Sequence, residues 1–266
     1  MKIIGIVGSP RKERGLTDQI VKKTLEGAAA AGAETEVTYL RDENLDYCIH
    51  CDYDCFTHLE CKQENLKPLF EKIETADGIV LGAPVYIWQA NGLTTSFFDK
   101  FRLSSGPWDR EEKNHRSALG IAVAGGTGTG VFPALKSIYS FLNLWEFNPL
   151  SPLPVTRFNL ETALEKAEAN GKKMGSDSVE KIDDTAELMA TYEDLKYLNY
   201  SRKDEFKWLA NQMIKDLKND SDNKEQVNHI RKMMAAGENL LETGKKGKAI
   251  KKYMTAYKEA REIWEK

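Results

Sequence analysis

The sequence predicts an α/β protein, with a doubly wound five-stranded parallel sheet of order 2-1-3-4-5 and a C-terminal α-helical extension. Three observations lead to this prediction. Short apolar runs alternate with amphipathic stretches in the first half of the 266-residue chain, which is the pattern of βαβ units whose sheet is covered on both faces. Five such runs alternate with five helical stretches, and the strand-like runs cease beyond about residue 175.

The strand candidates cover residues 2–8, 34–40, 78–83, 117–124 and, less regularly, 150–158. Helix candidates lie between and after them, at residues 16–31, 65–75, 93–101, 131–144 and 160–171. A doubly wound sheet of this order binds its ligand outside the carboxyl ends of the strands, at the switch point between the first and third. We therefore expect the ligand site in the loops that follow Gly8, Ala83 and Ala124.

The extension is expected over residues 176–266, after a first domain of residues 1–175. Its helix candidates cover residues 185–198, 203–217 and 225–264, with a break in the Asp- and Asn-rich stretch 218–223. Residues 235–260 have the small and aromatic spacing of a tetratricopeptide hairpin, but one such unit cannot bury its own apolar face. We expect a hairpin that packs within the chain or serves oligomerisation or partner binding.

Composition and charge exclude two classes of partner. The formal net charge of −3 gives no basic field of the kind that non-specific nucleic-acid binding needs. No leader-like segment precedes the first strand, and no apolar stretch approaches the ~20 residues that span a bilayer. We expect a cytoplasmic protein that binds neither nucleic acid nor a membrane.

The first loop, residues 8–17, contains the groups that a phosphate monoester needs at a helix N-terminus: backbone N–H groups, hydroxyls and positive charge. Ser9 and Thr17 supply hydroxyls, Arg11 supplies a guanidinium, and Gly15 leaves room for the backbone to approach. The loop has neither the lysine-containing Walker pattern nor the GxGxxG spacing, which disfavours an NTPase or a Rossmann dinucleotide site. The alternative is an ordinary βα turn with its basic residues in solvent.

At three places the chain resembles the NADPH-dependent FMN reductases, and within them the iron–sulfur flavoproteins of anaerobic archaea and bacteria. The first is the segment Gly8-Ser9-Pro10-Arg11-Lys12, with Thr17 seven positions after the proline. The others are residues 83–88 and a cysteine group between the second strand and the second helix. The resemblance covers about residues 1–175 and implies a flavodoxin-like domain that binds FMN.

In that family the first loop holds the FMN phosphate, and the second packs its backbone and aromatic side chains against the isoalloxazine ring. The resemblance therefore implies that the first loop binds FMN through Ser9, Arg11, Lys12, Gly15, Leu16 and Thr17, with Ser9, Arg11 and Thr17 as phosphate ligands. It implies ring contacts from Pro84, Val85, Tyr86, Ile87 and Trp88.

The residues of the second and third loops also suit a tricyclic ring, which needs an apolar wall and a few backbone donors. Tyr86 and Trp88 are the candidates for the wall, and core or dimer packing is the alternative for such a pair. The third loop contributes Gly125, Gly126 and Thr127, which can approach the other side of the ring or the ribityl chain. Its glycines can instead simply end the strand.

The four cysteines of the chain lie in one short segment, Cys48-x2-Cys51-x3-Cys55-x5-Cys61. A disulfide framework would spread its cysteines to close long loops, whereas thiolates this close can surround a [4Fe–4S] cluster. Structural zinc also accepts four thiolates, typically as two pairs separated by a longer span. The spacing favours the cluster; zinc and reduced thiols are the alternatives, and His50 or His58 could replace one cysteine.

These features predict an FMN-dependent electron-transfer oxidoreductase that couples FMN to a [4Fe–4S] cluster. Its partners would be ferredoxin or NAD(P)H as donor and a quinone, oxygen or peroxide as acceptor. No catalytic side chain is assigned, because the cofactors carry the chemistry. One alternative is an NAD(P)H-dependent FMN or quinone reductase with zinc or no metal at the cysteines, and another is a non-enzymatic scaffold that uses the helical extension. The resemblance further implies a homodimer or homotetramer, in which the cluster of one subunit lies near the flavin of another.

Overall fold

A mostly parallel sheet forms the centre of the computed structural model, which describes residues 1–266 except 59, 64–65, 103–113 and 218–222. Its strands are β1 (Lys2–Val7), β2 (Glu34–Tyr39), β3 (Gly78–Tyr86), β4 (Gln89–Ala90), β5 (Ser117–Ala124), β6 (Asn148–Pro149) and β7 (Leu153–Thr156). The strand order is β2-β1-β3-β5-β6, with β7 also paired to β5 and β4 antiparallel to β3. The predicted doubly wound α/β fold is confirmed.

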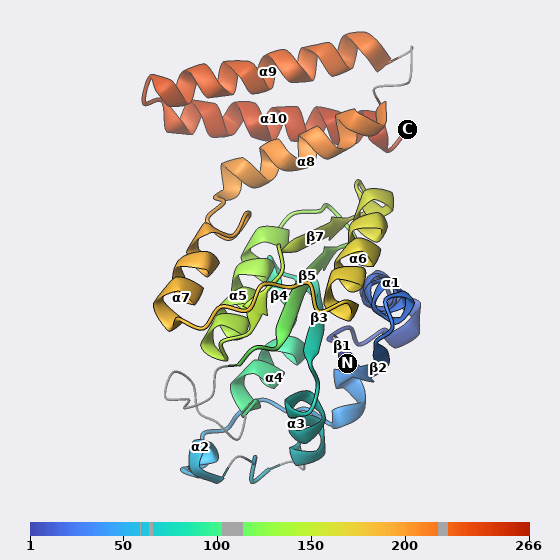
Figure 1. Ribbon diagram of the computed structural model, residues 1–266. Helices are drawn as coiled ribbons and strands as arrows, with labels where there is room; N and C mark the ends of the chain where they lie inside the picture. The colour runs from blue at the N-terminus through green and yellow to red at the C-terminus, as the bar shows by residue number, and fades with distance from the viewer. Residues whose placement is uncertain (59, 64–65, 103–113, 218–222) are drawn as a thin grey trace.

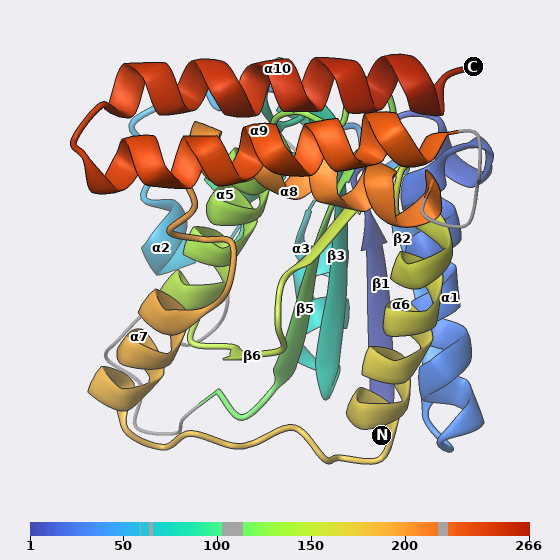
Figure 2. The same cartoon turned by 90° about the horizontal axis from the view of Figure 1, so that it is seen from above.

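Helices cover both faces of the sheet, as Figures 1 and 2 show. One face is covered by α1 (Leu16–Ala30) and α6 (Leu160–Gly175), and the other by α3 (Lys67–Glu74), α4 (Gly92–Lys100) and α5 (Val131–Leu144). Gly27 and Gly171 let α1 and α6 approach backbone to backbone, since a Cβ on Gly171 would lie 1.8 Å from the carbonyl oxygen of Thr24. The short elements are η1 (Lys12–Arg14), η2 (Leu40–Glu43) and α2 (Cys55–His58). Residue 65, where a helix was predicted to begin, lies outside the described residues.

The predicted fifth strand is divided into two short pieces, β6 and β7. Both pair with β5, but the pairing offset changes by one residue between Ala118–Pro149 and Ile121–Leu153. Proline has no N–H to donate to a ladder, so the edge strand is interrupted where Pro149 and Pro152 stand. The less regular fifth strand expected over 150–158 is present as β7, and β6 precedes it as a separate piece.

The C-terminal extension comprises α7 (Thr185–Asp194), α8 (Arg202–Asp216), α9 (Lys224–Glu242) and α10 (Lys246–Trp264). The helix α7 packs against α5, and the Tyr192 hydroxyl donates a hydrogen bond of 2.7 Å to the carbonyl oxygen of Phe147. The stretch predicted as 225–264 is two antiparallel helices, because Gly244 adopts a left-handed conformation with φ +71° and reverses the chain. Residues 218–222 of the predicted break lie outside the described residues.

The hairpin of α9 and α10 packs on α8 through apolar residues that include Leu209, Ile230 and Tyr253. The same cluster contains Phe158, which follows β7, so the three helices attach to the α/β domain near the carboxyl ends of its strands.

Among the residues that the structure describes, no helix has both the length and the apolar character required to cross a bilayer.

Candidate functional site: three loops at the carboxyl edge of the sheet

The loops after β1, β3 and β5 meet at one edge of the sheet because these strands are parallel. The first loop is joined to the second by hydrogen bonds: the N–H of Gly8 donates to the carbonyl oxygen of Gly82 at 2.8 Å, and the Asn91 side-chain amide donates to the carbonyl oxygen of Gly8 at 2.9 Å. The buried Thr94 hydroxyl donates to Asn91 Oδ1 at 2.6 Å and fixes the orientation of that amide. The two loops therefore hold a fixed relative position.

The first loop leads into an uncapped helix N-terminus. Gly15 precedes α1, and no side chain caps this end of the helix. Thr17 in the first turn is only 2% exposed, and its hydroxyl has no hydrogen-bond partner among the described residues. Free N–H groups and a hydroxyl at a helix N-terminus are the groups that bind a phosphate, so the residues present fit the FMN phosphate.

The remaining residues of the first loop have different environments. Ser9 is 3% exposed, and its Oγ accepts a hydrogen bond of 3.2 Å from the N–H of Arg11. Arg11 itself is exposed, whereas the ammonium of Lys12 forms an ion pair with Asp42. Arg14 is exposed as well, so the positive charge available to an anion in this loop is that of Arg11 and Arg14 rather than that of Lys12.

The second loop is a tight β-hairpin, which sequence reasoning did not predict. Strand β3 extends to Tyr86, which pairs with Gln89 of β4, and the two residues between them, Ile87 and Trp88, have φ angles of +47° and +64°. A two-residue turn with both φ values positive normally contains Asn or Gly, and a β-branched residue there costs on the order of 1–3 kcal/mol. Tyr86, Ile87 and Trp88 are 45%, 93% and 55% exposed, so three of the five predicted ring residues are accessible at this strained turn. Pro84 is buried and Val85 half-buried behind them.

The second and third loops surround a common cavity of about 260 Å³, lined by Val85, Ile87, Trp88, Ala124, Gly125, Gly126, Thr127, Gly128 and Thr129. Gly130 brings the two loops into contact, because a Cβ at this position would lie 2.5 Å from Cα of Trp88. Leu16 of the first loop approaches the same cavity, 3.8 Å from where a Cβ on Gly125 would lie. The structure thus brings the three predicted loops together, and their contacts with FMN stay a prediction.

The C-terminal extension also reaches this site, and sequence reasoning missed it. The buried carboxylate of Glu205 on α8 accepts hydrogen bonds from the N–H groups of Gly130 and Phe132, at 3.0 and 3.2 Å. Its other oxygen accepts a bond of 2.7 Å from Arg202, whose guanidinium carbon lies 3.7 Å from the centroid of the Trp88 ring. No local pattern could identify these residues, since they lie more than 70 positions from the loops they contact.

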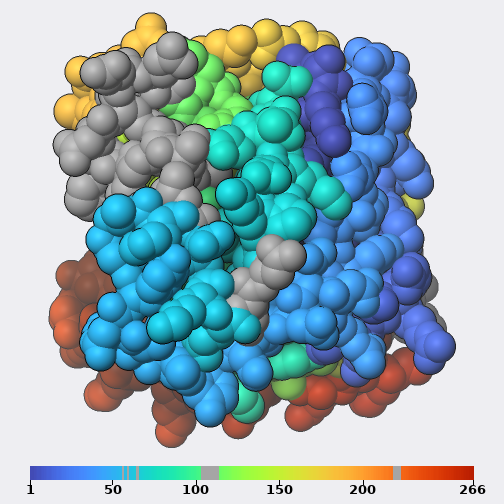
Figure 3. All heavy atoms as spheres, turned by 90° about the horizontal axis from the view of Figure 1, so that it is seen from below, coloured from blue at the N-terminus to red at the C-terminus, as the bar shows by residue number. Residues whose placement is uncertain are grey.

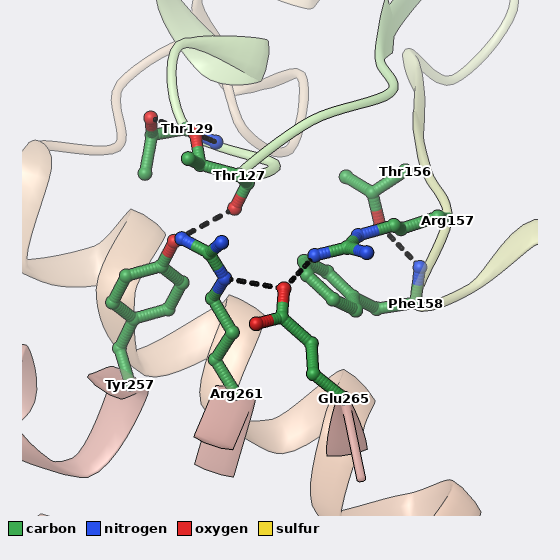
Figure 4. Close-up of polar contacts among 8 residues, drawn as sticks. All are labelled: Thr127, Thr129, Thr156, Arg157, Phe158, Tyr257, Arg261 and Glu265. Atoms are coloured by element: carbon green, nitrogen blue, oxygen red, sulfur yellow. Dashed lines mark hydrogen bonds and ion pairs between the residues drawn. The ribbon is translucent and has the colours of Figure 1, made fainter. Parts of the chain in front are cut away.

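A second helix of the extension contacts the third loop. The Tyr257 hydroxyl of α10 donates a hydrogen bond of 2.8 Å to the carbonyl oxygen of Thr127, as Figure 4 shows. Beside it, Glu265 forms ion pairs with Arg157 and Arg261, which join the end of α10 to the chain after β7. The glycine-rich loop is therefore held from the side of the extension as well as from the sheet.

Residues 48–58, which include helix α2 and three of the four cysteines, lie on the side of the domain opposite the extension (Figures 1 and 3). All four cysteines line one cavity of about 230 Å³, together with His50, Asp52, Tyr53, Asp54, Gln63, Asp99, Lys100 and Arg102. They are free thiols, and among the described residues no three His, Cys, Asp or Glu side chains converge into an arrangement that could hold a metal ion. His58 does not line this cavity; its ring stacks on Tyr53 at 4.3 Å. The donor set suits a cluster, but its sulfur atoms are not assembled around a common centre.

Arg102 and Lys100 at the end of α4 are basic residues that sequence reasoning did not assign to the cysteine cavity. Burial raises the pKa of Cys55 above its ordinary value, the charge of Arg102 opposes that shift, and the neighbouring thiols add to it. Burial also lowers the pKa of Arg102, and the same thiols counteract this. The cavity therefore brings a partly buried guanidinium close to several potential thiolates.

Comparison with known proteins supports the resemblance derived from the loops. A family model described as NADPH-dependent FMN reductase matches residues 1–153. An iron–sulfur flavoprotein of Methanocaldococcus jannaschii is 35% identical over 149 residues, which cover 53% of this chain and 71% of that protein. An iron–sulfur flavoprotein of Archaeoglobus fulgidus is 30% identical over 150 residues, 56% of this chain and 75% of that protein.

Among solved structures, an azoreductase of Bacillus anthracis matches with a TM-score of 0.51 at 15% identity, covering 65% of this chain and 99% of its own. This likeness concerns the fold alone. The family match covers more than half of the chain and coincides with the three loops described above. The chain belongs to the NADPH-dependent FMN reductase family and is an FMN-dependent oxidoreductase.

Proposed function

We propose that the chain binds FMN with its phosphate at the N-terminus of α1 and its ring in the cavity between the second and third loops. The observation that carries this proposal is the uncapped start of α1, where Thr17 is 2% exposed and its hydroxyl has no partner among the described residues, beside a cavity lined by Trp88. When bound, FMN would supply hydride and electron transfer, and the protein would supply orientation and control of potential. Titration of the chain with FMN and with riboflavin tests it, because only FMN has the phosphate. Much tighter binding of FMN supports the assignment, and equal affinities would refute it.

The cysteine cavity is proposed to hold a [4Fe–4S] cluster through Cys48, Cys51, Cys55 and Cys61. The support is the donor set of four thiols around one cavity, together with two relatives that are named iron–sulfur flavoproteins. Helix α4 starts beside Asn91, which contacts the first loop, and ends at Lys100 in the wall of the cysteine cavity. Its nine residues span roughly 13 Å at 1.5 Å per residue, so the proposed cluster and flavin sites lie at the two ends of one helix.

Metal and sulfide analysis of anaerobically purified protein decides between the occupants of the cysteine cavity. A cluster predicts four iron and four acid-labile sulfide per chain and a broad absorption shoulder beside the flavin bands. This shoulder should be lost in Cys51→Ser and retained in the control His58→Ala, whose ring lies outside the cavity wall. Zinc without sulfide, or thiols alone, would contradict the cluster.

A second candidate function is an NAD(P)H-dependent FMN or quinone reductase with zinc or no metal at the cysteines. Its form without a metal is favoured because no metal-binding group converges among the described residues. Turnover of NADPH with a quinone by the Cys51→Ser variant at the wild-type rate would support this candidate. Dependence of turnover on ferredoxin and on the intact cysteines would instead support the function in which FMN is coupled to a [4Fe–4S] cluster.

The subunit arrangement is proposed to be a homodimer or homotetramer. Tyr47 and Ile49, next to the cysteines, are 71% and 55% exposed, and exposed apolar residues that form a patch mark protein–protein interaction sites. Light scattering of the purified protein tests this. Substituting both residues with Ser should yield a monomer if this segment lies at the subunit interface.

A further inference from the structure

Arg202 of the C-terminal extension lies directly against the predicted ring wall of the flavin site. Its guanidinium carbon is 3.7 Å from the centroid of the Trp88 indole, which is the spacing of a stacked cation–π contact. Trp88 lines the cavity between the second and third loops and stands at the tip of a strained turn with φ +64°. Within a single chain, the extension thus contacts a residue of the cofactor cavity.

The position of Arg202 is fixed by Glu205, one helical turn further along α8. The two side chains are joined by a 2.7 Å ion pair, and Glu205 is 1% exposed. The other carboxylate oxygen accepts the N–H groups of Gly130 and Phe132 at the start of α5. Because this helix N-terminus shares the negative charge of Glu205, the guanidinium is held in place without being fully neutralised.

From this geometry, and resting on the proposed FMN site, we propose that Arg202 is a positioning residue of the flavin site, with two effects. It fixes the indole of Trp88 at the ring cavity, and it places a positive charge beside the bound isoalloxazine. A reduced flavin carries more negative charge than an oxidised one, and a nearby cation therefore favours the reduced form. The extension, for which the resemblance assigns no role, would in this way set both the affinity for FMN and its midpoint potential.

The test compares four forms of the full chain: wild type, Arg202→Met, Arg202→Lys and Lys215→Met. Lys215 lies on the same helix, roughly 20 Å further along, and has the same charge, so Lys215→Met controls for the change in net charge and for substitution on α8. Two quantities are measured: the Kd for FMN, and the midpoint potential of the bound flavin against a reference dye. Thermal unfolding of each apoprotein shows that it is folded.

For Arg202→Met we expect the Kd for FMN to rise about tenfold and the midpoint potential to become more negative. Arg202→Lys should keep the midpoint potential close to that of wild type, because it keeps the charge. It should bind FMN more weakly than wild type, because lysine lacks the planar group that stacks on the indole. Lys215→Met should change neither. In a Trp88→Ala background, Arg202→Met should have little further effect on Kd, because the contact is already absent.

An Arg202→Met protein with wild-type Kd and midpoint potential would overturn this inference alone. An equal change in Lys215→Met, or additive effects of the Arg202 and Trp88 substitutions on Kd, would do the same. A wild-type chain that binds no FMN would overturn the proposed function and this inference together. The two failures are therefore distinguishable.

Discussion

Removal of the Glu205 carboxylate is expected to destabilise the contact between the α/β domain and the extension. In Glu205→Ala, the N–H groups of Gly130 and Phe132 lose their acceptor, and Arg202 loses its ion-pair partner. All three contacts converge on a side chain that is 1% exposed. The substitution thus removes an interaction that no local element can replace.

The magnitude follows from the three lost contacts. A buried N–H left without an acceptor costs about 1–3 kcal/mol, and water that enters the space left by the carboxylate favours the lower end of that range. The Arg202 side chain is 30% exposed, so its charge is partly solvated and adds little. We expect Glu205→Ala to lower the free energy of unfolding by about 3 kcal/mol. Glu205→Gln keeps an acceptor but loses the charge, and should lower it by about half as much.

Urea unfolding of the apoprotein, followed by circular dichroism and tryptophan fluorescence, measures this change. The control is Glu262→Ala, which removes an exposed carboxylate of α10 and should stay within about 0.5 kcal/mol of wild type. If Glu205→Ala lowered the free energy of unfolding by less than about 1 kcal/mol, Glu205 would not be a main link between the α/β domain and the extension.

Three further predictions concern the first loop, the glycine-rich loop and the N-terminus of α8. Thr17→Ala should weaken FMN binding roughly tenfold in a fluorescence titration while leaving riboflavin affinity unchanged; an equal loss for both ligands would contradict a phosphate contact. Gly130→Ala should destabilise the apoprotein by more than about 2 kcal/mol in urea, because φ is +92° and the new Cβ would meet the Trp88 backbone, whereas Gly126→Ala, with open space around it, should cost much less. At Asp204, burial raises the pKa, but the hydrogen bonds from Lys203 and Ser201 outweigh it, so the pKa is lowered from its ordinary 3.8. Asp204 therefore stabilises α8 above about pH 4, and this contribution of ~1 kcal/mol is lost as pH falls through the lowered pKa. The Asp204→Asn variant should lose less stability on acidification than wild type does.

Much of the α/β fold could be predicted because its central strands β1, β3 and β5 are buried on both faces and therefore read as apolar runs. β1, β3 and β5 were located in this way, and their parallel order placed the three loops at one edge. The divided edge strand was not predicted, since its two pieces are short and separated by prolines. Hydrophobic periodicity does not resolve segments of two to four residues.

The parts of the site that were missed depend on conformation and on distant contacts. The hairpin at Ile87 and Trp88 requires left-handed backbone at residues that rarely adopt it, so no turn pattern revealed it. Glu205, Arg202 and Tyr257 reach the site through tertiary packing of an extension whose sequence indicates only amphipathic helices. The grouping of the cysteines was evident from spacing, whereas their arrangement depends on the path of a loop with positive φ at His50 and Asp52.

The central claim, an FMN site built from the three loops, is tested most directly by the flavin content of the chain. Protein incubated with FMN, freed of excess ligand and then denatured should release one FMN per chain, identified by chromatography. This result would also eliminate the non-enzymatic scaffold as an alternative. Protein that releases no flavin after this treatment would contradict the account.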